Sequence, residues 1–227
     1  MKAARLSRMH TWCYAHVLNL VNSDASSVCV AAVSLFGLRA ELSTFFNDSY
    51  KRMEVWEEHL QTKPGNTKRP NLERSGQTRW ASRGRALRKL FGSYTDQSSE
   101  FYSDLLIILQ QIIEAPDFKG SDRYEAQKLS ENLRKFETIV MVFTFIRIFD
   151  ITTPVSDYLQ TSDLDIMQAW RMINKDTENV EKISRDFSGI LETAFNFVVH
   201  ANLKLEEVKI SVPKMYNVIT VICERLK

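Results

Sequence analysis

The first cysteine and the second histidine of the chain have a spacing found in metal sites. Cys13 and His16 form a C-x-x-H pair, and on a helix these two side chains would share one face. A structural zinc site takes four ligands, usually as two such pairs, and the other candidates form no second pair: His10, Cys29, His59, His200 and Cys223. A Cys/His hydrolase would also need a third group to orient the histidine. Spacing alone therefore favours no metal and no cofactor, with Cys13 buried and His16 hydrogen-bonded locally.

Carboxylates are plentiful, but none stands out as a catalytic pair. Asp163 and Asp165 are better interpreted as a cluster at the start of a helix, where negative charge interacts favourably with the helix dipole. The chain has no glycine-rich phosphate loop, Walker lysine or nucleophile elbow. Nothing in these motifs requires catalysis.

Positive charge is concentrated in one segment. Residues 63 to 89 contain nine lysines and arginines against Glu73 alone, a net charge of +8 in a chain whose overall net charge is +2. Such asymmetry is typical of a surface that binds a polyanion, although most charge runs are simply solvated faces. The segment consists of a loop over residues 61–77, which contains two prolines and two glycines, followed by a predicted helix.

That helix is expected to begin at Thr78, a good N-cap, and to have two different sides. One side would carry Trp80, Leu87 and Phe91 towards a core. The other side would carry three cations as a basic ridge, with two more on a flank: Arg85, Arg88 and Lys89 on the ridge, and Arg79 and Arg83 on the flank.

Most of the remaining chain also has helical periodicity, and Gly (7) and Pro (5) are sparse, so we predict a mainly α fold of eight or nine helices. Apolar residues at Leu129, Leu133, Phe136, Val140 and Phe143 suggest one long helix from Ser121, interrupted by Pro154 after Asp150. In the first half of the chain, further helices are predicted over Cys13–Ala25, from a cap at Ser26 or Ser27 to Phe46, over Tyr50–Leu60 and over Ser98–Glu114. In the second half, one helix should start near Asp163, one should cover Phe187–Val208, and the last should follow Pro213 and run to Lys227. Residues Arg8 to Trp12 are read as the tail of a strand.

The composition indicates a soluble intracellular protein. The most apolar run, Ile139 to Phe149, contains Arg147 and is shorter than the ~20 residues of a bilayer span, so we interpret it as a buried helix and expect no membrane association. Three irregularly spaced cysteines fit a reducing cytosol or nucleus. The first residues lack the apolar core of a signal peptide.

Four strings occur in the order found in hAT-type DNA transposases and cover most of residues 10–170. The sequence CYAHVLNLV (13–21) resembles the family's C-x-x-H-x-L-N-L segment, and QTRWASR (77–83) resembles its T-R-W-x-S-R segment. The strings FFNDSYKR (45–52) and DYLQTSDLDIMQA (157–169) are similar to two shorter family stretches. The resemblance is greatest to transposase-derived proteins of the zinc-finger MYM type.

The resemblance implies a ribonuclease-H-like catalytic domain interrupted by a helical insertion. Residues 1–25 would be a short remnant of the α/β catalytic domain, and residues 26–227 an all-helical insertion domain with a basic loop at 61–77. The family's metal-binding aspartates and glutamate match no position of this chain, so we expect a catalytically incomplete protein and assign no catalytic residue. An alternative is a truncated gene model of an active transposase.

The resemblance also implies a DNA surface. Trp80 matches the family tryptophan that stacks on an unpaired base near the transposon end. The alternative role for Trp80 is packing in the core, because it lies on the apolar side of its helix. Arg79 would contact the adjacent DNA backbone. Cys13 and His16 match residues near the active site and the DNA end. We therefore predict a nuclear protein with residual, salt-dependent binding of transposon-end DNA through Lys68, Arg69, Arg79, Trp80, Arg83, Arg85 and Arg88. The competing hypothesis is a helical scaffold that binds a protein partner or a second copy.

Overall fold

The computed structural model describes residues 14–61, 80–97 and 100–207, which form nine helices and no strand. The mainly α prediction is therefore confirmed for this part of the chain. The predicted strand tail before Cys13, the basic loop, the Thr78 cap and the helix after Pro213 lie outside the described residues. The helices are α1 (Tyr14–Val28), α2 (Val30–Asn47), α3 (Tyr50–Gln61), α4 (Trp80–Phe91), α5 (Glu100–Glu114), α6 (Gly120–Leu133), α7 (Phe136–Tyr158), α8 (Ile166–Arg185) and α9 (Phe187–Glu207).

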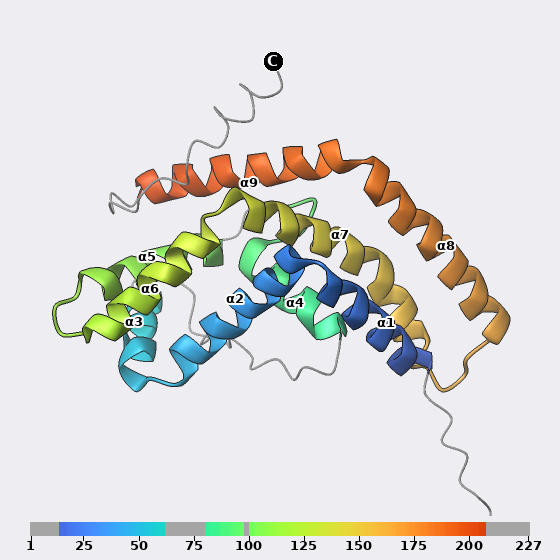
Figure 1. Ribbon diagram of the computed structural model, residues 1–227, viewed down its shortest axis with the longest axis horizontal. Coiled ribbons are helices and arrows are strands. Elements are labelled where there is room, and N and C mark those ends of the chain that lie inside the picture. Colours follow the sequence, from blue (N-terminus) through green and yellow to red (C-terminus); the bar gives the residue numbers. More distant parts are fainter. Residues whose placement is uncertain (1–13, 62–79, 98–99, 208–227) are drawn as a thin grey trace, which may run out of the picture.

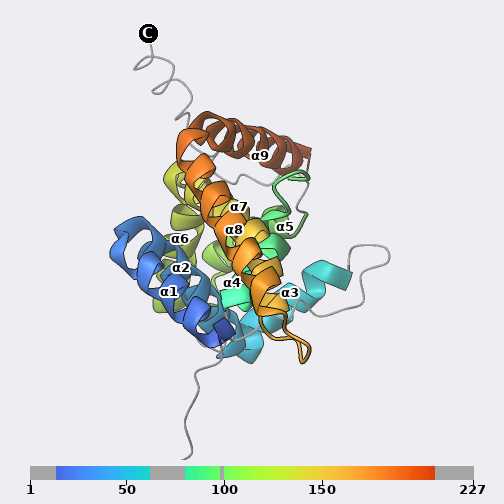
Figure 2. The same cartoon turned by 90° about the vertical axis from the view of Figure 1, so that its right-hand side faces the viewer.

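The longest helix, α7, is the centre of the molecule. It contacts α1, α2, α4, α6, α8 and α9, and in Figure 1 the last two form an arch over it. In Figure 2 α8 lies in front of α7, and α9 crosses above. One face of α7 is fully buried and carries Ile139, Val142, Phe143, Ile146 and Phe149. Although α7 is long and apolar enough to cross a membrane by length and composition, its neighbours cover it as they cover a core helix.

Two details of the predicted long helix are wrong. The chain breaks after Leu133, and the extended backbone of Lys135 (ψ 126°) starts a new helix, so that α6 packs against α5. The apolar stripe continues across the break because both helices turn that side towards the same core. Pro154 does not end α7, which continues to Tyr158: Pro154 lies on the exposed side, and Val155 and Ser156 beyond it are buried.

The predicted cap of α2 is also different. Ser26 and Ser27 belong to α1, where their hydroxyls donate to the carbonyl oxygens of Ser23 and Asp24. Cys29 occupies the N-cap position of α2 without a side-chain bond. At α8 the interpretation of a helix-start cluster is confirmed for Asp165, whose Oδ1 accepts from the backbone N–H groups of Met167 (2.8 Å) and Gln168 (3.3 Å).

Helix α1 has an inverted amphipathic pattern. Its inward side carries mainly small and polar residues, among them Ala15 and Ser26, with one large apolar residue, Leu18, packed partly buried beside Ala15. Its outward side carries five large apolar side chains that are 43% to 85% exposed: Tyr14, Val17, Leu20, Val21 and Val28. An apolar helix face normally packs against another element, so this face is an open surface that a further layer would cover.

Candidate nucleic-acid interface

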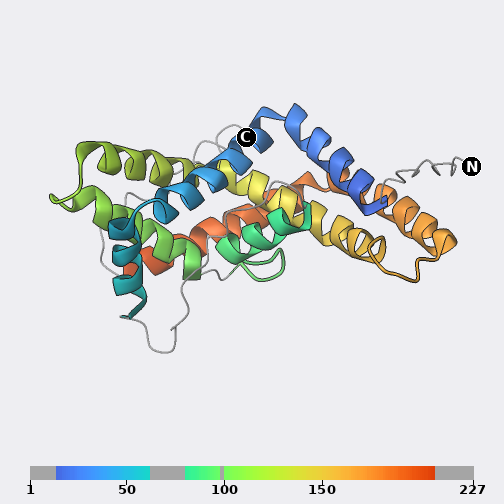
Figure 3. The same cartoon turned by 90° about the horizontal axis from the view of Figure 1, so that it is seen from below.

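Helix α4 is fixed against α7 by close packing. Trp80, Leu87 and Phe91 are buried, as the helical wheel predicted. Gly84 lies so close to α7 that an added Cβ would stand 2.7 Å from Cγ of Phe149. Glycine is therefore required at this position for the two helices to approach. The side view from below in Figure 3 shows α4 along α7, with its other side turned away from the core.

Trp80 is a core residue. Only 3% of its surface is exposed, and its ring centroid lies 4.6 Å from that of Phe149. Its Nε1–H donates to Oγ1 of Thr152 at 3.2 Å, and its backbone N–H donates to Oδ1 of Asn19 at 3.3 Å. The indole ring is thus packed against other side chains, and its N–H already has an acceptor inside the protein. In this conformation no face of the indole is open for a base to stack on.

Arg83 is half-buried between helices and does not stand on an open flank. Its guanidinium lies over the rings of Phe36 (4.8 Å) and Trp80 (5.7 Å), and Nη1 donates to Oγ of Ser26 at 3.5 Å. Burial lowers the pKa of this guanidinium, although an arginine remains charged in proteins. Arg83 therefore joins α1, α2 and α4, and its charge is only partly available to an external ligand.

Arg88 lies at the edge of the predicted ridge. Its Nε and Nη2 both donate to Oδ1 of Asp150 on α7, at 3.1 Å and 2.6 Å. Arg147, which is also on α7, lies with its guanidinium 4.5 Å from the ring centroid of Tyr94. The first contact places Arg88 at the seam between α4 and α7 (the α4–α7 seam), paired with a carboxylate, and the second places Arg147 against the segment that follows α4.

The solvent-facing side of α4 is formed by Arg85 and Lys89. Both side chains are exposed, and four residues apart on a helix they lie on the same face. Arg85 has no ion-pair partner among the described residues. The outward cations of α4 are therefore fewer than the sequence predicted, since Arg83 is half-buried and Arg88 is paired.

Several predicted site residues are not brought together by the described structure. Cys13, Lys68, Arg69 and Arg79 lie outside the described residues. His16 is exposed on α1. Within residues 14–61, 80–97 and 100–207, no group of three or more His, Cys, Asp and Glu side chains could hold a metal ion.

The structure adds residues that sequence reasoning missed. Asp150 and Thr152 of α7 and Ser26 of α1 form hydrogen bonds with side chains of α4. Asp150 is 62 positions from Arg88 in the sequence, and Ser26 is 57 positions from Arg83. No local pattern joins residues so far apart, so only the tertiary packing reveals these pairs.

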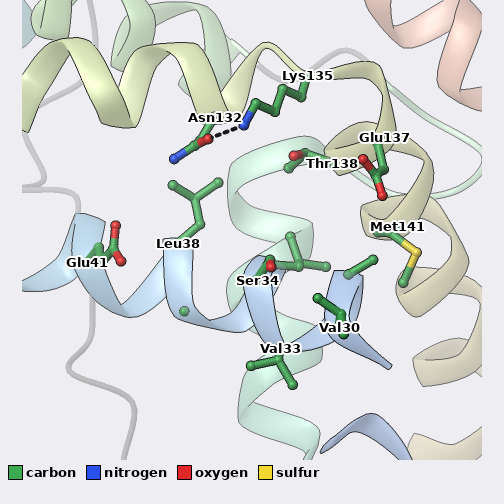
Figure 4. Close-up of a pocket in the computed structure, with 13 residues that line it drawn as sticks. Val30, Val33, Ser34, Leu38, Glu41, Asn132, Lys135, Glu137, Thr138 and Met141 are labelled. Atoms are coloured by element: carbon green, nitrogen blue, oxygen red, sulfur yellow. Dashed lines mark hydrogen bonds between the residues drawn. The ribbon is translucent and has the colours of Figure 1, made fainter. Parts of the chain in front are cut away.

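A groove of about 570 Å³ lies between α2 and the start of α7 (Figure 4). Its lining includes apolar side chains, among them Val30, Val33 and Leu38 of α2. Its rim is polar and includes Glu41 and Glu137, together with Lys135, whose Nζ donates to Oδ1 of Asn132 at 2.7 Å. Two carboxylates on the rim make this groove a poor site for a nucleic acid.

Comparisons with protein-family models, with curated proteins and with solved structures gave no match for this chain. The function is therefore argued from the geometry of α4 and its surroundings, together with the sequence strings described above.

Proposed function

We propose that this chain binds the phosphate backbone of DNA through the outward face of α4, with salt-dependent and largely sequence-independent affinity. The observation that carries the proposal is the position of Arg85 and Lys89, which are exposed on a helix whose opposite side is locked into the core. A rigid helix that presents cations outward binds a polyanion without first having to be ordered. In the sequence, α4 directly follows the rest of the basic segment, from Lys63 to Arg79.

The same proposal includes the architecture that the hAT-type strings imply. Residues 26–227 would be a helical insertion domain, and residues 1–25 would belong to a ribonuclease-H-like catalytic domain. The exposed apolar side chains of α1 support a further layer on this side of the molecule, because an apolar helix face normally packs against another element. The proposal is limited to DNA binding and assigns no catalytic residue, metal or cofactor.

Trp80 takes a different role from the one that the resemblance implies. We propose that its burial holds α4 at the correct angle on α7, so that it supports the DNA surface without touching DNA. Arg83 supports the same surface by packing its guanidinium on Phe36 and Trp80. Direct phosphate contacts are assigned to Arg85, Lys89 and, in part, Arg88.

Fluorescence anisotropy of a labelled duplex, titrated with the protein at several salt concentrations, tests the proposal. Affinity should fall steeply with salt, with a slope of about −0.9 in log–log form for each phosphate contact. The Arg85→Ala, Lys89→Ala double variant should weaken binding and make the slope shallower by about two contacts. Absence of binding at low salt, or affinity that does not depend on salt, would overturn it.

The second candidate function is a helical scaffold for a protein partner. The exposed apolar side chains of α1 favour it, as do those of α8, where Ile166 and Trp170 are 66% and 59% exposed. Exposed apolar surface of this kind often marks an interaction site. Two results together would favour the scaffold. The double variant at Arg85 and Lys89 would bind DNA as wild type does, and substitutions on α8 would abolish binding of a defined protein partner.

A further inference from the structure

The pair formed by Arg88 and Asp150 joins the proposed DNA surface to the core helix. Arg88 donates two N–H bonds to a single oxygen of Asp150, which leaves Oδ2 of the carboxylate outside this interaction. The side chains are 27% and 43% exposed, so water and ions reach the pair. Exposed ion pairs contribute little stability, because solvent screens them and both partners lose side-chain freedom.

The pair lies among cations. Arg85 precedes Arg88 by three positions on α4, and Lys89 follows it. On α7, Arg147 precedes Asp150 by three positions, so the two share one side of that helix. A carboxylate oxygen thus occupies the place that a phosphate oxygen would take on Arg88.

We propose that Asp150 competes with DNA phosphate for Arg88 and thereby sets how many cations the α4–α7 seam offers to DNA. The inference rests on the proposed function and deepens it, because it names an affinity-determining residue of the same surface. When a phosphate approaches, Arg88 exchanges the Asp150 oxygen for a phosphate oxygen, and the exposed carboxylate returns to water. The negative charge that stays beside the phosphate lowers the affinity.

Removal of the Asp150 charge leaves the packing of α4 on α7 intact. That packing is made by Trp80, Gly84, Leu87 and Phe149, and none of these contacts involves the carboxylate. Asp150→Asn keeps the shape of the side chain and removes only its charge. Asp157→Asn is the matched control, since Asp157 is also exposed on α7 and the change in net charge is the same.

The test measures duplex affinity against salt for wild type, Asp150→Asn, Asp157→Asn, Arg88→Ala and the Asp150→Asn, Arg88→Ala double variant. Asp150→Asn should bind roughly three- to tenfold tighter at low salt, with a slope steeper by about one phosphate contact. Asp157→Asn should stay close to wild type, and the gain should vanish when Arg88 is alanine.

The outcomes separate the two proposals. If wild type binds with a salt dependence, but Asp150→Asn behaves as Asp157→Asn does, the competition is wrong and DNA binding stands. The competition is also wrong if the gain from Asp150→Asn survives without Arg88. If no variant binds DNA even at low salt, the proposed function fails and the inference fails with it.

Discussion

At the scale of single residues, the indole of Trp80 is the side chain whose role the structure changes most. The sequence resemblance would place this tryptophan against an unpaired base, but it is held in the core by Phe149, Thr152 and Asn19. A buried aromatic residue with a satisfied N–H contributes mainly to stability. Its influence on DNA binding therefore acts through the orientation of α4.

Trp80→Ala should destabilise the protein by about 3–5 kcal/mol, because it removes a large buried side chain. Thr152→Val should cost about 1–3 kcal/mol, since it leaves the indole N–H buried without an acceptor. Urea unfolding followed by circular dichroism measures both values. A Trp80→Ala protein that is as stable as wild type but has lost DNA binding would show that the indole contacts DNA.

Asp176 of α8 should make stability depend on pH. Its Oδ2 lies away from solvent without a hydrogen-bond partner, and burial raises the pKa of the carboxyl above its usual value. A folded pKa above the unfolded pKa contributes stability that is complete below the unfolded pKa and is lost as pH rises through the folded pKa. Asp176→Asn should therefore raise Tm at pH 7.

The gain from Asp176→Asn should shrink as the pH falls through the raised folded pKa towards the unfolded value of 3.8, and should be absent below it. Thermal unfolding between pH 3 and 8 measures this, and Asp163→Asn is the control because Asp163 is exposed. A stability difference that is the same at every pH would contradict the role given to the Asp176 charge.

At the scale of elements, the contact of α4 with α7 depends on the absence of a side chain at Gly84. Gly84→Ala should destabilise the protein by about 1–3 kcal/mol, since the new Cβ would meet Phe149 at 2.7 Å. Gly37 of α2 is the matched control, because an added Cβ there meets nothing within 4 Å.

Gly37→Ala should leave the stability unchanged or raise it by up to about 1 kcal/mol, because alanine has the higher helix propensity. The midpoint of urea unfolding compares the two variants. Equal effects of the two substitutions would mean that α4 does not approach α7 as closely as described.

Most helices were predictable because their apolar periodicity is strong, as in α4, where Trp80, Leu87 and Phe91 all lie in the core. The break between α6 and α7 was not predictable from that signal, since Leu133 and Phe136 continue the same stripe on either side of it. The exposure of the α4 cations was predictable only where one helix determines it, as for Arg85 and Lys89. The neutralisation of Arg88 by Asp150 and the burial of Arg83 depend on contacts between distant segments.

At the scale of the whole molecule, the outward apolar face of α1 is exposed within the part of the chain that the structure describes. Val17→Glu with Val21→Glu should change the free energy of unfolding by no more than about 0.5 kcal/mol, since both side chains are exposed. The same double variant should reduce self-association, which sedimentation velocity measures. Ala15→Glu, on the buried side of α1, should instead destabilise the protein. Strong destabilisation by the Val17 and Val21 changes would contradict the orientation of α1.

The central claim is that the outward face of α4, and not the exposed cations of α8, binds DNA. Arg85→Glu with Lys89→Glu should be compared with Arg171→Glu and Lys175→Glu, which reverse an exposed Arg and Lys at the same spacing on α8. Duplex affinity measured by anisotropy at low salt should collapse for the α4 pair and stay near wild type for the α8 pair. Equal losses from both pairs, or a loss from the α8 pair alone, would contradict the assignment of α4 as the DNA interface.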